Sequence, residues 1–317
     1  MTRVIIYLCI IAICLVLIKQ FSNFKRRPRW EIVDIDNQEH FGEETTPPQS
    51  KVAIACLMRK PVDLSQWLEH HRQLGVSHFF IRLEDTREQE DYLKAQDDVS
   101  LNIAESDKSG NNYETLQTRQ IEYVNKSLKD AKTLKIDWLF HIDADELLHG
   151  SLNFLDTLDS KYKNVWMENA EAIFNLDKKD AGKQQQNDTC FSASKFLRCS
   201  NGAPCRSYVN GKAGGRVESG VGLKGPHNFH YKGAHTGDHV FNIPFNTLHV
   251  LHFDSCSFSA WVEKFHHLGK KKNDKIPFTY YNESINAVEQ AFNTYKKFLA
   301  PSTADISKDQ IYTAKDL

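Results

Sequence analysis

Two aspartates, Asp143 and Asp145, are separated by one residue and follow an apolar run, residues 137–142. Carboxylate oxygens at this spacing can bind one divalent ion together with the phosphates that the ion carries, and hard oxygen ligands suit Mg²⁺ or Mn²⁺. A D-x-D triplet alone is also common in solvated turns, so the strand-like run before it is what gives the pattern weight. The sequence therefore predicts a metal and diphosphate site at Asp143 and Asp145.

Two histidines, His249 and His252, lie in a second apolar run, residues 247–253. A neutral imidazole can complete a metal site from the far side of a cleft. Histidines in apolar runs are nonetheless more often hydrogen-bonded core residues than ligands. Spacing alone therefore favours a core role for both.

Strands and helices that alternate along the chain must position these side chains. We expect strands over residues 52–58, 76–83, 99–104, 137–142 and 164–174, and helices over 64–74 and 113–132, the first capped by Gly75. This alternation is typical of an α/β sheet, in which ligands bind beyond the carboxyl ends of the strands. After the last of these strands, the composition predicts a long polar loop region through Gly237.

The two ends of the chain differ from this central part. Residues 4–18 carry no charge and predict an uncleaved transmembrane anchor over residues 1–19, with a cleaved signal peptide as the alternative. We expect a stem over residues 20–50, a single domain over residues 51–300 and a C-terminal tail over residues 301–317. The basic residues that follow the anchor outnumber those before it, which favours a cytosolic body.

Charge and cysteine content narrow the class of protein. Forty basic and forty-one acidic residues in 317 leave a net charge of −1, so no nucleic-acid partner is expected. Cys9 and Cys14 fall in the anchor and Cys56 in a core strand. The other four lack C-x-x-C spacing, which disfavours zinc and leaves a disulfide in an oxidising compartment or free thiols: Cys190, Cys199, Cys205 and Cys256. Three sequons would fit a lumenal body, but roughly two are expected by chance, so they do not decide the orientation: Asn125, Asn187 and Asn282.

Three segments occur in a fixed order between residues 51 and 268: Gln66–Ile81 (QWLEHHRQLGVSHFFI), Trp138–Leu147 (WLFHIDADEL), and Leu251–Phe253 followed by Ser257, Phe258 and Lys264. They resemble the first helix and second strand, the W-x-x-x-x-D-x-D-E-F/L metal motif and the late H-Y…K-S-x-E-E-F-x-x-K segment of glycosyltransferases in the family 2-like and family 92 group. Phe253 departs from the usual Tyr, and Asp254-Ser255 from the K-S pair.

The resemblance implies an α/β protein of GT-A fold, with a mixed central sheet flanked by helices. It implies a hexosyltransferase that moves a sugar, galactose favoured, from a nucleotide-sugar donor, UDP-sugar favoured, to a glycan or glycoconjugate acceptor. Mn²⁺ or Mg²⁺ would be held by Asp143, Asp145 and His252, while Asp85 would contact the nucleoside and Arg119 a phosphate. It also implies a type II membrane protein of the Golgi or endoplasmic reticulum with a lumenal body. This orientation is the opposite of the one that the basic residues after the anchor favour.

An inverting transfer needs a carboxylate that takes the proton of the acceptor hydroxyl. In such domains this base falls between the metal motif and the late histidine, so we expect Glu218, with Asp238 and Glu171 as alternatives. The segment from Gly225 to Phe229 is expected to shape the acceptor side.

Two other classes of protein compete with this interpretation. A phosphohydrolase with Asp143 as nucleophile would carry Thr or Val two residues after Asp145, where Leu147 stands. A non-catalytic or degenerate sugar-binding membrane protein would bind a donor without turnover, and the presence of Asp143, Asp145 and His252 argues against it.

Overall fold

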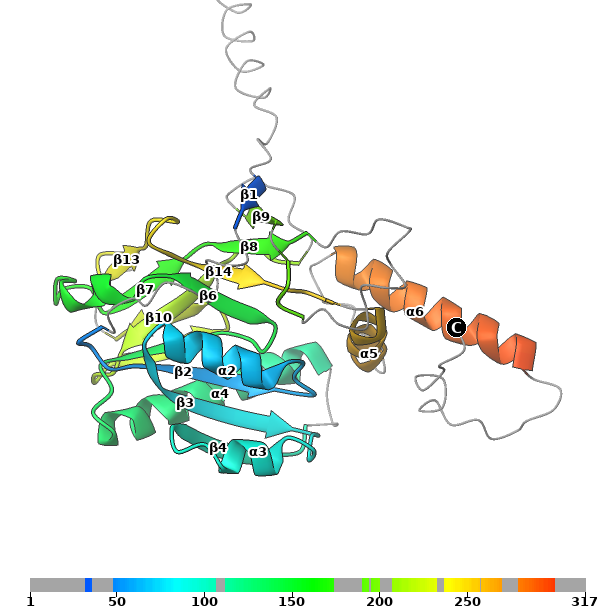
Figure 1. Ribbon diagram of the computed structural model, residues 1–317, viewed down its shortest axis with the longest axis horizontal. Coiled ribbons are helices and arrows are strands. Elements are labelled where there is room, and N and C mark those ends of the chain that lie inside the picture. The colour runs from blue at the N-terminus through cyan, green and yellow to red at the C-terminus, as the bar shows by residue number, and fades with distance from the viewer. Residues whose placement is uncertain are drawn as a thin grey trace, which may run out of the picture.

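A mixed seven-stranded sheet forms the centre of the protein (Figure 1). The computed structural model describes residues 32–35, 48–106, 112–173, 190–193, 195–199, 207–232, 237–256, 258–269 and 279–299. In spatial order the strands are β13 (Val240–Asn242), β7 (Asn164–Met167), β10 (Lys212–Arg216), β5 (Trp138–His141), β2 (Val52–Met58), β3 (Val76–Glu84) and β4 (Val99–Ala104). Neighbours from β5 to β4 are parallel, whereas β10 is antiparallel to both β5 and β7. The carboxyl ends of four parallel strands therefore meet at one edge, and the predicted α/β class is confirmed.

Helices cover both faces of this sheet. In Figure 1, α2 (Leu64–Gln73) and α4 (Asn112–Thr133) lie on opposite sides of β2 and β3. On β3, Phe79 joins the core cluster that contains Trp67 of α2, and Phe80 joins the cluster that contains Val124 of α4. Because both faces are covered, these strands are continuous hydrophobic runs. A short helix, α3 (Glu90–Lys94), connects β3 to β4.

The predicted elements between residues 51 and 142 are confirmed. Strands β2 and β4 have the predicted bounds, and α2, β3, α4 and β5 differ from prediction by one or two residues at their ends. Gly75 caps α2 as predicted, with φ of 98° and an N–H that donates to the Arg72 carbonyl at 3.0 Å. A positive φ at this position is what favours glycine.

A second sheet of five strands changes one prediction. Its order is β1 (Ile32–Asp34), β9 (Lys195–Cys199), β8 (Asn169–Ala172), β14 (Leu248–His252) and β6 (Glu146–Gly150). The single strand expected over 164–174 is wrong, because the chain passes from β7 in the first sheet to β8 in the second. The Asn169 amide marks the break, since it donates to the Tyr208 carbonyl at 3.0 Å and accepts from the Gly211 N–H at 3.3 Å.

The long polar loop expected through Gly237 is also wrong, because it contains four strands. These are β9, β10 and the antiparallel pair β11 (Val221–Gly225) and β12 (Asn228–Tyr231). Strand β10 (KAGGR) resembles a loop in composition yet pairs with two neighbours inside the main sheet. A Cβ on Gly214 would lie 2.8 Å from the Phe140 ring and one on Gly215 2.5 Å from the Phe229 ring, so close packing, not flexibility, requires glycine here.

Two helices stand apart from the sheets. α5 (Phe258–Gly269) and α6 (Thr279–Leu299) pack on each other around Phe265, Leu268 and Val288. In Figure 1 the pair lies beyond the edge toward which the arrows of β2 and β3 point. It therefore stands at the carboxyl edge of the parallel strands.

Parts of the predicted stem join the domain. β1 pairs antiparallel with β9, and Ile35 belongs to the main core. The N–H groups of Gln49 and Ser50 donate to the carboxylate of Asp156 in the 3-10 helix η1 (Asn153–Asp156) at 2.9 and 2.8 Å. The predicted anchor and the C-terminal tail lie outside the described residues. Within the described ranges, no helix has both the length and the hydropathy needed to cross a bilayer.

Of the four cysteines for which the sequence left a disulfide or a free thiol open, three are disulfide-bonded, and Cys205 lies outside the described residues. Cys190 and Cys256 form a disulfide with an S–S distance of 2.00 Å, and Cys199 is also disulfide-bonded. Cys56 is free and buried in β2, as expected. The sequon at Asn125 is engaged in the fold, since its amide bonds both backbone groups of Leu223.

Candidate functional site

The D-x-D turn joins the two sheets. It connects β5 of the first sheet to β6 of the second, so both aspartates lie at the carboxyl edge. The Asp143 N–H donates to the Glu146 carboxylate at 2.7 Å, and the Glu146 N–H donates to the Asp143 carbonyl at 3.2 Å. These bonds close the turn and hold its two carboxylates in different directions.

Asp143 faces a buried lysine. Because β10 runs antiparallel to β5, the first residue of β10, Lys212, lies beside the end of β5. Its ammonium contacts Asp143 at 2.5 Å and Glu146 at 3.2 Å, and Gln120 of α4 donates to the other Asp143 oxygen at 2.8 Å. Burial acts to raise the pKa of the Asp143 carboxyl, but Lys212 holds it below its usual value. Asp143 is therefore ionised and already neutralised by the protein.

Asp145 meets two residues from β14 and the turn after it. Strand β14 pairs antiparallel with β6 so that His252 lies opposite Glu146, and the Phe253 N–H donates to the Asp145 carbonyl at 2.8 Å. This register brings Asp145, His252 and Asp254 together, with one ligand atom from each lying within 4.8 Å of the others. Two carboxylates and one imidazole at this spacing could hold a divalent ion. The predicted ligands Asp145 and His252 belong to this candidate triad, whose third member is Asp254 and not Asp143.

The imidazole of His252 is oriented by a chain of hydrogen bonds. Ser207 donates its hydroxyl to the Glu171 carboxylate at 2.5 Å, so its oxygen accepts from Nδ1–H of His252 at 3.0 Å. This tautomer leaves Nε2 directed at Asp145, 3.7 Å away. A second hydrogen-bonding partner of this kind is usual for a histidine that binds metal. Glu171, an alternative base in the sequence prediction, is buried behind His252 and positions it instead.

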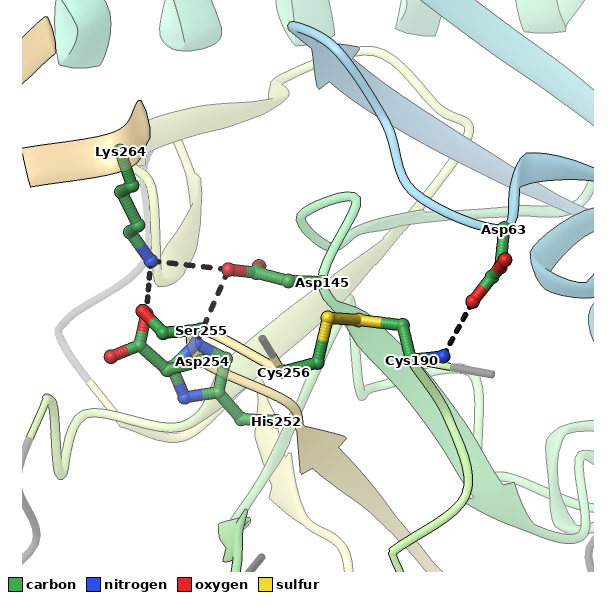
Figure 2. Close-up of a disulfide and its surroundings, with 8 residues drawn as sticks. All are labelled: Asp63, Asp145, Cys190, His252, Asp254, Ser255, Cys256 and Lys264. Atoms are coloured by element: carbon green, nitrogen blue, oxygen red, sulfur yellow. Dashed lines mark hydrogen bonds and ion pairs between the residues drawn. A yellow bond between two sulfur atoms is a disulfide. The ribbon is translucent and has the colours of Figure 1, made fainter. Parts of the chain in front are cut away.

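A lysine from α5 completes the cluster (Figure 2). The Lys264 ammonium lies 3.2 Å from Asp145 and in closer contact with Asp254. Burial acts to raise the pKa of Asp145, and Lys264 and His252 hold it well below its ordinary value. Burial lowers the pKa of His252, but Asp145 and Asp254 raise it to about 9. At neutral pH the Asp145 carboxyl is therefore ionised and the His252 ring is charged, and the Lys264 ammonium contacts both Asp145 and Asp254.

A cavity of about 590 Å³ opens over these side chains. Its walls come from the carboxyl edge of the first sheet, from α4, from α5 and from the segment around His227. Pro226 and His227, from the segment predicted to shape the acceptor side, line the cavity. Burial and Lys212 lower the pKa of His227 to about 4, and its Nδ1 bonds the Gly211 carbonyl at 2.7 Å. The ring is therefore neutral, with Nε2 as an acceptor.

Arg119 lines the same cavity, on the side of α4. Glu84, at the end of β3, accepts from Nε and Nη2 of Arg119 at 2.8 and 3.0 Å. Its third nitrogen, Nη1, is buried and has no hydrogen-bond partner among the described groups. Asp85 is not among the residues that line the cavity, since its carboxylate accepts both hydrogen bonds of Ser106 and faces Arg59 at 3.7 Å. The structure thus places Arg119 at the cavity, with Glu84 rather than Asp85 beside it.

The two bases favoured by the sequence lie at the other edge of the sheet. Glu218 follows β10, where the Val217 N–H bonds the Asp137 carbonyl at the start of β5, and its carboxylate pairs with Lys163 at 3.0 Å. Asp238 is exposed just before β13, beside the start of β7. Neither lines the cavity. We therefore withdraw both as bases.

Every carboxylate that lines the cavity has a cationic partner. The pairs are Glu84 with Arg119, Asp143 with Lys212, Asp145 with Lys264, and Glu263 with Arg59. A neighbouring cation stabilises the ionised form of a carboxylate and weakens it as a base.

Sequence reasoning missed Lys212 and Asp254. Lys212 opens a glycine-rich stretch that resembles a loop, and Asp254 stands where the family pattern has a lysine. For Asp254 a signal was present, because the residue lies two positions after His252, as Asp145 does after Asp143. No such spacing existed for Lys212.

Comparison with known proteins adds little to this geometry. No family model and no curated protein sequence matches the chain. A solved cytidylyltransferase from Leptospira borgpetersenii serovar Hardjo-bovis (strain JB197) is similar over 38% of this chain and 54% of that chain, with 16% identity and a TM-score of 0.23. The match spans about half the length of that protein. A similarity this low supports no statement about activity.

Proposed function

We propose that this chain is a metal-dependent glycosyltransferase of GT-A fold, related to the family 92 group, that uses a nucleotide-sugar donor. The observation that carries the proposal is the meeting of the D-x-D turn with His252 in one cavity at the carboxyl edge of parallel strands. This edge is where open α/β sheets bind ligands, and about 590 Å³ is within the size range of small-molecule sites. UDP-galactose is the donor that we favour from the family resemblance.

The residues present fit a Mn²⁺ or Mg²⁺ ion. Asp145, His252 and Asp254 would hold it, since their ligand atoms converge and Nδ1 of His252 bonds Ser207, which leaves Nε2 to bind the ion in exchange for its proton. When bound, the ion supplies neutralisation of the negative charge on a departing diphosphate. Asp143 would stay with Lys212 and contact the donor from the opposite side of the turn.

Arg119 is the candidate phosphate ligand. The bidentate bond to Glu84 fixes its plane, while Nη1, which has no partner within the described part of the chain, is available to a phosphate oxygen. Arginine suits this role because its planar donors match phosphate oxygens. This is the role that the family resemblance implies for Arg119.

The acceptor would lie near His227, and inversion remains our proposal for the stereochemistry. The reaction then needs a proton acceptor that is not held by a cation. We propose Nε2 of His227, whose pKa of about 4 is comparable to that of a carboxylate. A His227→Gln variant is expected to lose transfer while it keeps donor binding, which a sugar-transfer assay beside donor titration checks.

We also propose that the body is lumenal, as in a type II protein of the Golgi or endoplasmic reticulum. The Cys190–Cys256 disulfide supports this, because such bonds persist in oxidising compartments and are rare in the cytosol.

The proposal is tested by release of nucleoside diphosphate from a panel of UDP- and GDP-sugars by the full chain in detergent. We expect release from one donor with Mn²⁺, loss with chelator, and a decrease of at least about 100-fold in Asp145→Asn, in line with the loss of a group that stabilises charge in the transition state. Lys126→Gln, which removes an exposed charge from α4, is the matched control.

Two other outcomes count against the proposal. A folded chain that binds a donor without turnover would make it the non-catalytic sugar-binding protein. A folded chain that binds no nucleotide sugar would remove the transferase interpretation altogether.

A further inference from the structure

Lys264 occupies the position from which a cation would bind the triad. Its ammonium contacts Asp145 and Asp254, the two carboxylates of the three residues that can hold an ion (Figure 2). Figure 2 also shows the Lys264 side chain reaching from its helix toward the two carboxylates. The same oxygens cannot bind a monovalent ammonium and a divalent ion at full strength, because the two cations would lie within a few ångströms of each other and repel.

The charge balance of the cluster supports competition. The carboxylates of Asp145 and Asp254 face two cations, the Lys264 ammonium and the charged His252 ring. A divalent ion added beside both would leave a buried excess of positive charge, whereas replacement of the ammonium and of the His252 Nε2 proton by the ion leaves the net charge of the cluster unchanged.

Lys264 can leave without disruption of the sheets. It belongs to α5, whose hydrophobic contacts are made with α6 in a cluster separate from the main core. Near the cavity, ion pairs connect α5 to the sheets. Lys264 pairs with Asp145, and the Glu263 carboxylate lies 3.1 Å from Arg59 and 3.1 Å from Lys60. The Lys264 ammonium also lies 5.4 Å from the centre of the Tyr281 ring on α6, within the range of a cation–π contact. The ring can therefore hold the ammonium after it leaves the two carboxylates.

We propose that Lys264 is a built-in competitor of the divalent ion: it holds Asp145 and Asp254 while the metal is absent and is displaced from them when the metal binds. The displaced ammonium remains in the cavity wall, where it faces the donor diphosphate. This inference rests on the metal triad of the proposed function, but its test needs neither donor nor acceptor.

Direct binding of Mn²⁺ to the full chain, followed by electron paramagnetic resonance, tests the competition. Lys264→Gln should raise the affinity for Mn²⁺ by about tenfold or more, within the usual range for coupling between two binding events. Lys264→Arg retains the charge and should stay close to the native chain. Lys60→Gln removes a charge from the same cavity without touching the triad, and we expect a change of less than about twofold.

A second measurement uses the native chain and does not depend on whether a variant folds. Acetylation of lysines by acetic anhydride, read by mass spectrometry, should increase at Lys264 when Mn²⁺ is added and remain unchanged at Lys60. The inference is overturned if Lys264→Gln leaves Mn²⁺ affinity unchanged or lowers it, if labelling of Lys264 does not rise, or if no form of the chain binds Mn²⁺. If Mn²⁺ binds as expected but no sugar is transferred, only the proposed function is contradicted.

Discussion

Lys212 is a fully buried lysine whose ammonium has two carboxylate partners, Asp143 and Glu146. The hydroxyl of Tyr208 also donates to Glu146. Burial lowers the pKa of Lys212, but the two carboxylates raise it beyond its usual value, so the side chain stays charged. At the scale of single residues, the site is thus a pair of charge clusters, one around Lys212 and one around Lys264, on either side of the D-x-D turn.

Removal of the Lys212 charge should be costly. Lys212→Met leaves two buried carboxylates without their cation, and we expect a loss of about 3–5 kcal/mol in the free energy of unfolding, measured by urea denaturation. Lys163→Met is the control, because it breaks the partly exposed pair with Glu218 and should cost less than about 1 kcal/mol. Equal losses in the two variants would contradict the structural role given to Lys212.

At the scale of elements, the disulfide holds the turn that carries Asp254. Cys256 lies two residues after Asp254, and its partner Cys190 is tied to the start of α2 through its N–H, which donates to Asp63 at 2.5 Å (Figure 2). Three segments that are distant in sequence are thereby joined beside the triad. The pairing depends on tertiary structure, since the two cysteines are 66 positions apart in the sequence.

Loss of this disulfide should affect both stability and metal binding. In the chain-entropy estimate, Cys190→Ser with Cys256→Ser costs about 4 kcal/mol for a loop of 66 residues. We also expect a weaker affinity for Mn²⁺, because the turn that carries Asp254 is less restrained. Thermal unfolding and Mn²⁺ titration measure the two effects, with Cys56→Ala as the cysteine control. Unchanged Mn²⁺ affinity in a folded double variant would show that the disulfide does not position Asp254.

At the scale of the whole molecule, buried histidines set the response to acid. Burial lowers the pKa of His71 well below its usual value and, with Lys212 as a second cause, that of His141 to about 4. His71 accepts the Leu148 N–H at 3.1 Å and bonds the Trp67 carbonyl at 2.8 Å, so it connects α2 to β6 in its neutral form. Both histidines are uncharged in the folded state at neutral pH.

The free energy of unfolding should therefore fall in acid. Both pKa values are depressed in the folded state, so the unfolded chain takes up protons first as the pH drops below about 6.5, and stability decreases from that point toward the folded pKa values. Together the two residues should remove about 2 kcal/mol between pH 6 and pH 5. Urea denaturation over this range checks the slope, and His71→Gln should reduce the loss of stability by about 1 kcal/mol. An unchanged slope in that variant would assign the acid response to other groups.

Hydrophobic periodicity was sufficient to predict the parallel half of the main sheet, its two flanking helices and the position of Asp143 and Asp145 at a strand end. Local patterns determine these features because buried parallel strands and amphipathic helices each need a continuous apolar face. The D-x-D spacing also identified Asp145, and the resemblance added His252, both of which belong to the triad.

Only the tertiary structure decided the partners of these residues. Pairing of β10 with β5 brings Lys212 to Asp143, and pairing of β14 with β6 brings His252 and Asp254 to Asp145. The pairing of β10 with β5 also places Glu218 at the opposite edge of the sheet, away from the cavity. Strand register over such distances has no local signature in sequence, because it depends on which chain segments share a sheet. The sequence by itself therefore determined where a candidate metal site would begin, and the sheet pairing determined which residues complete the candidate triad.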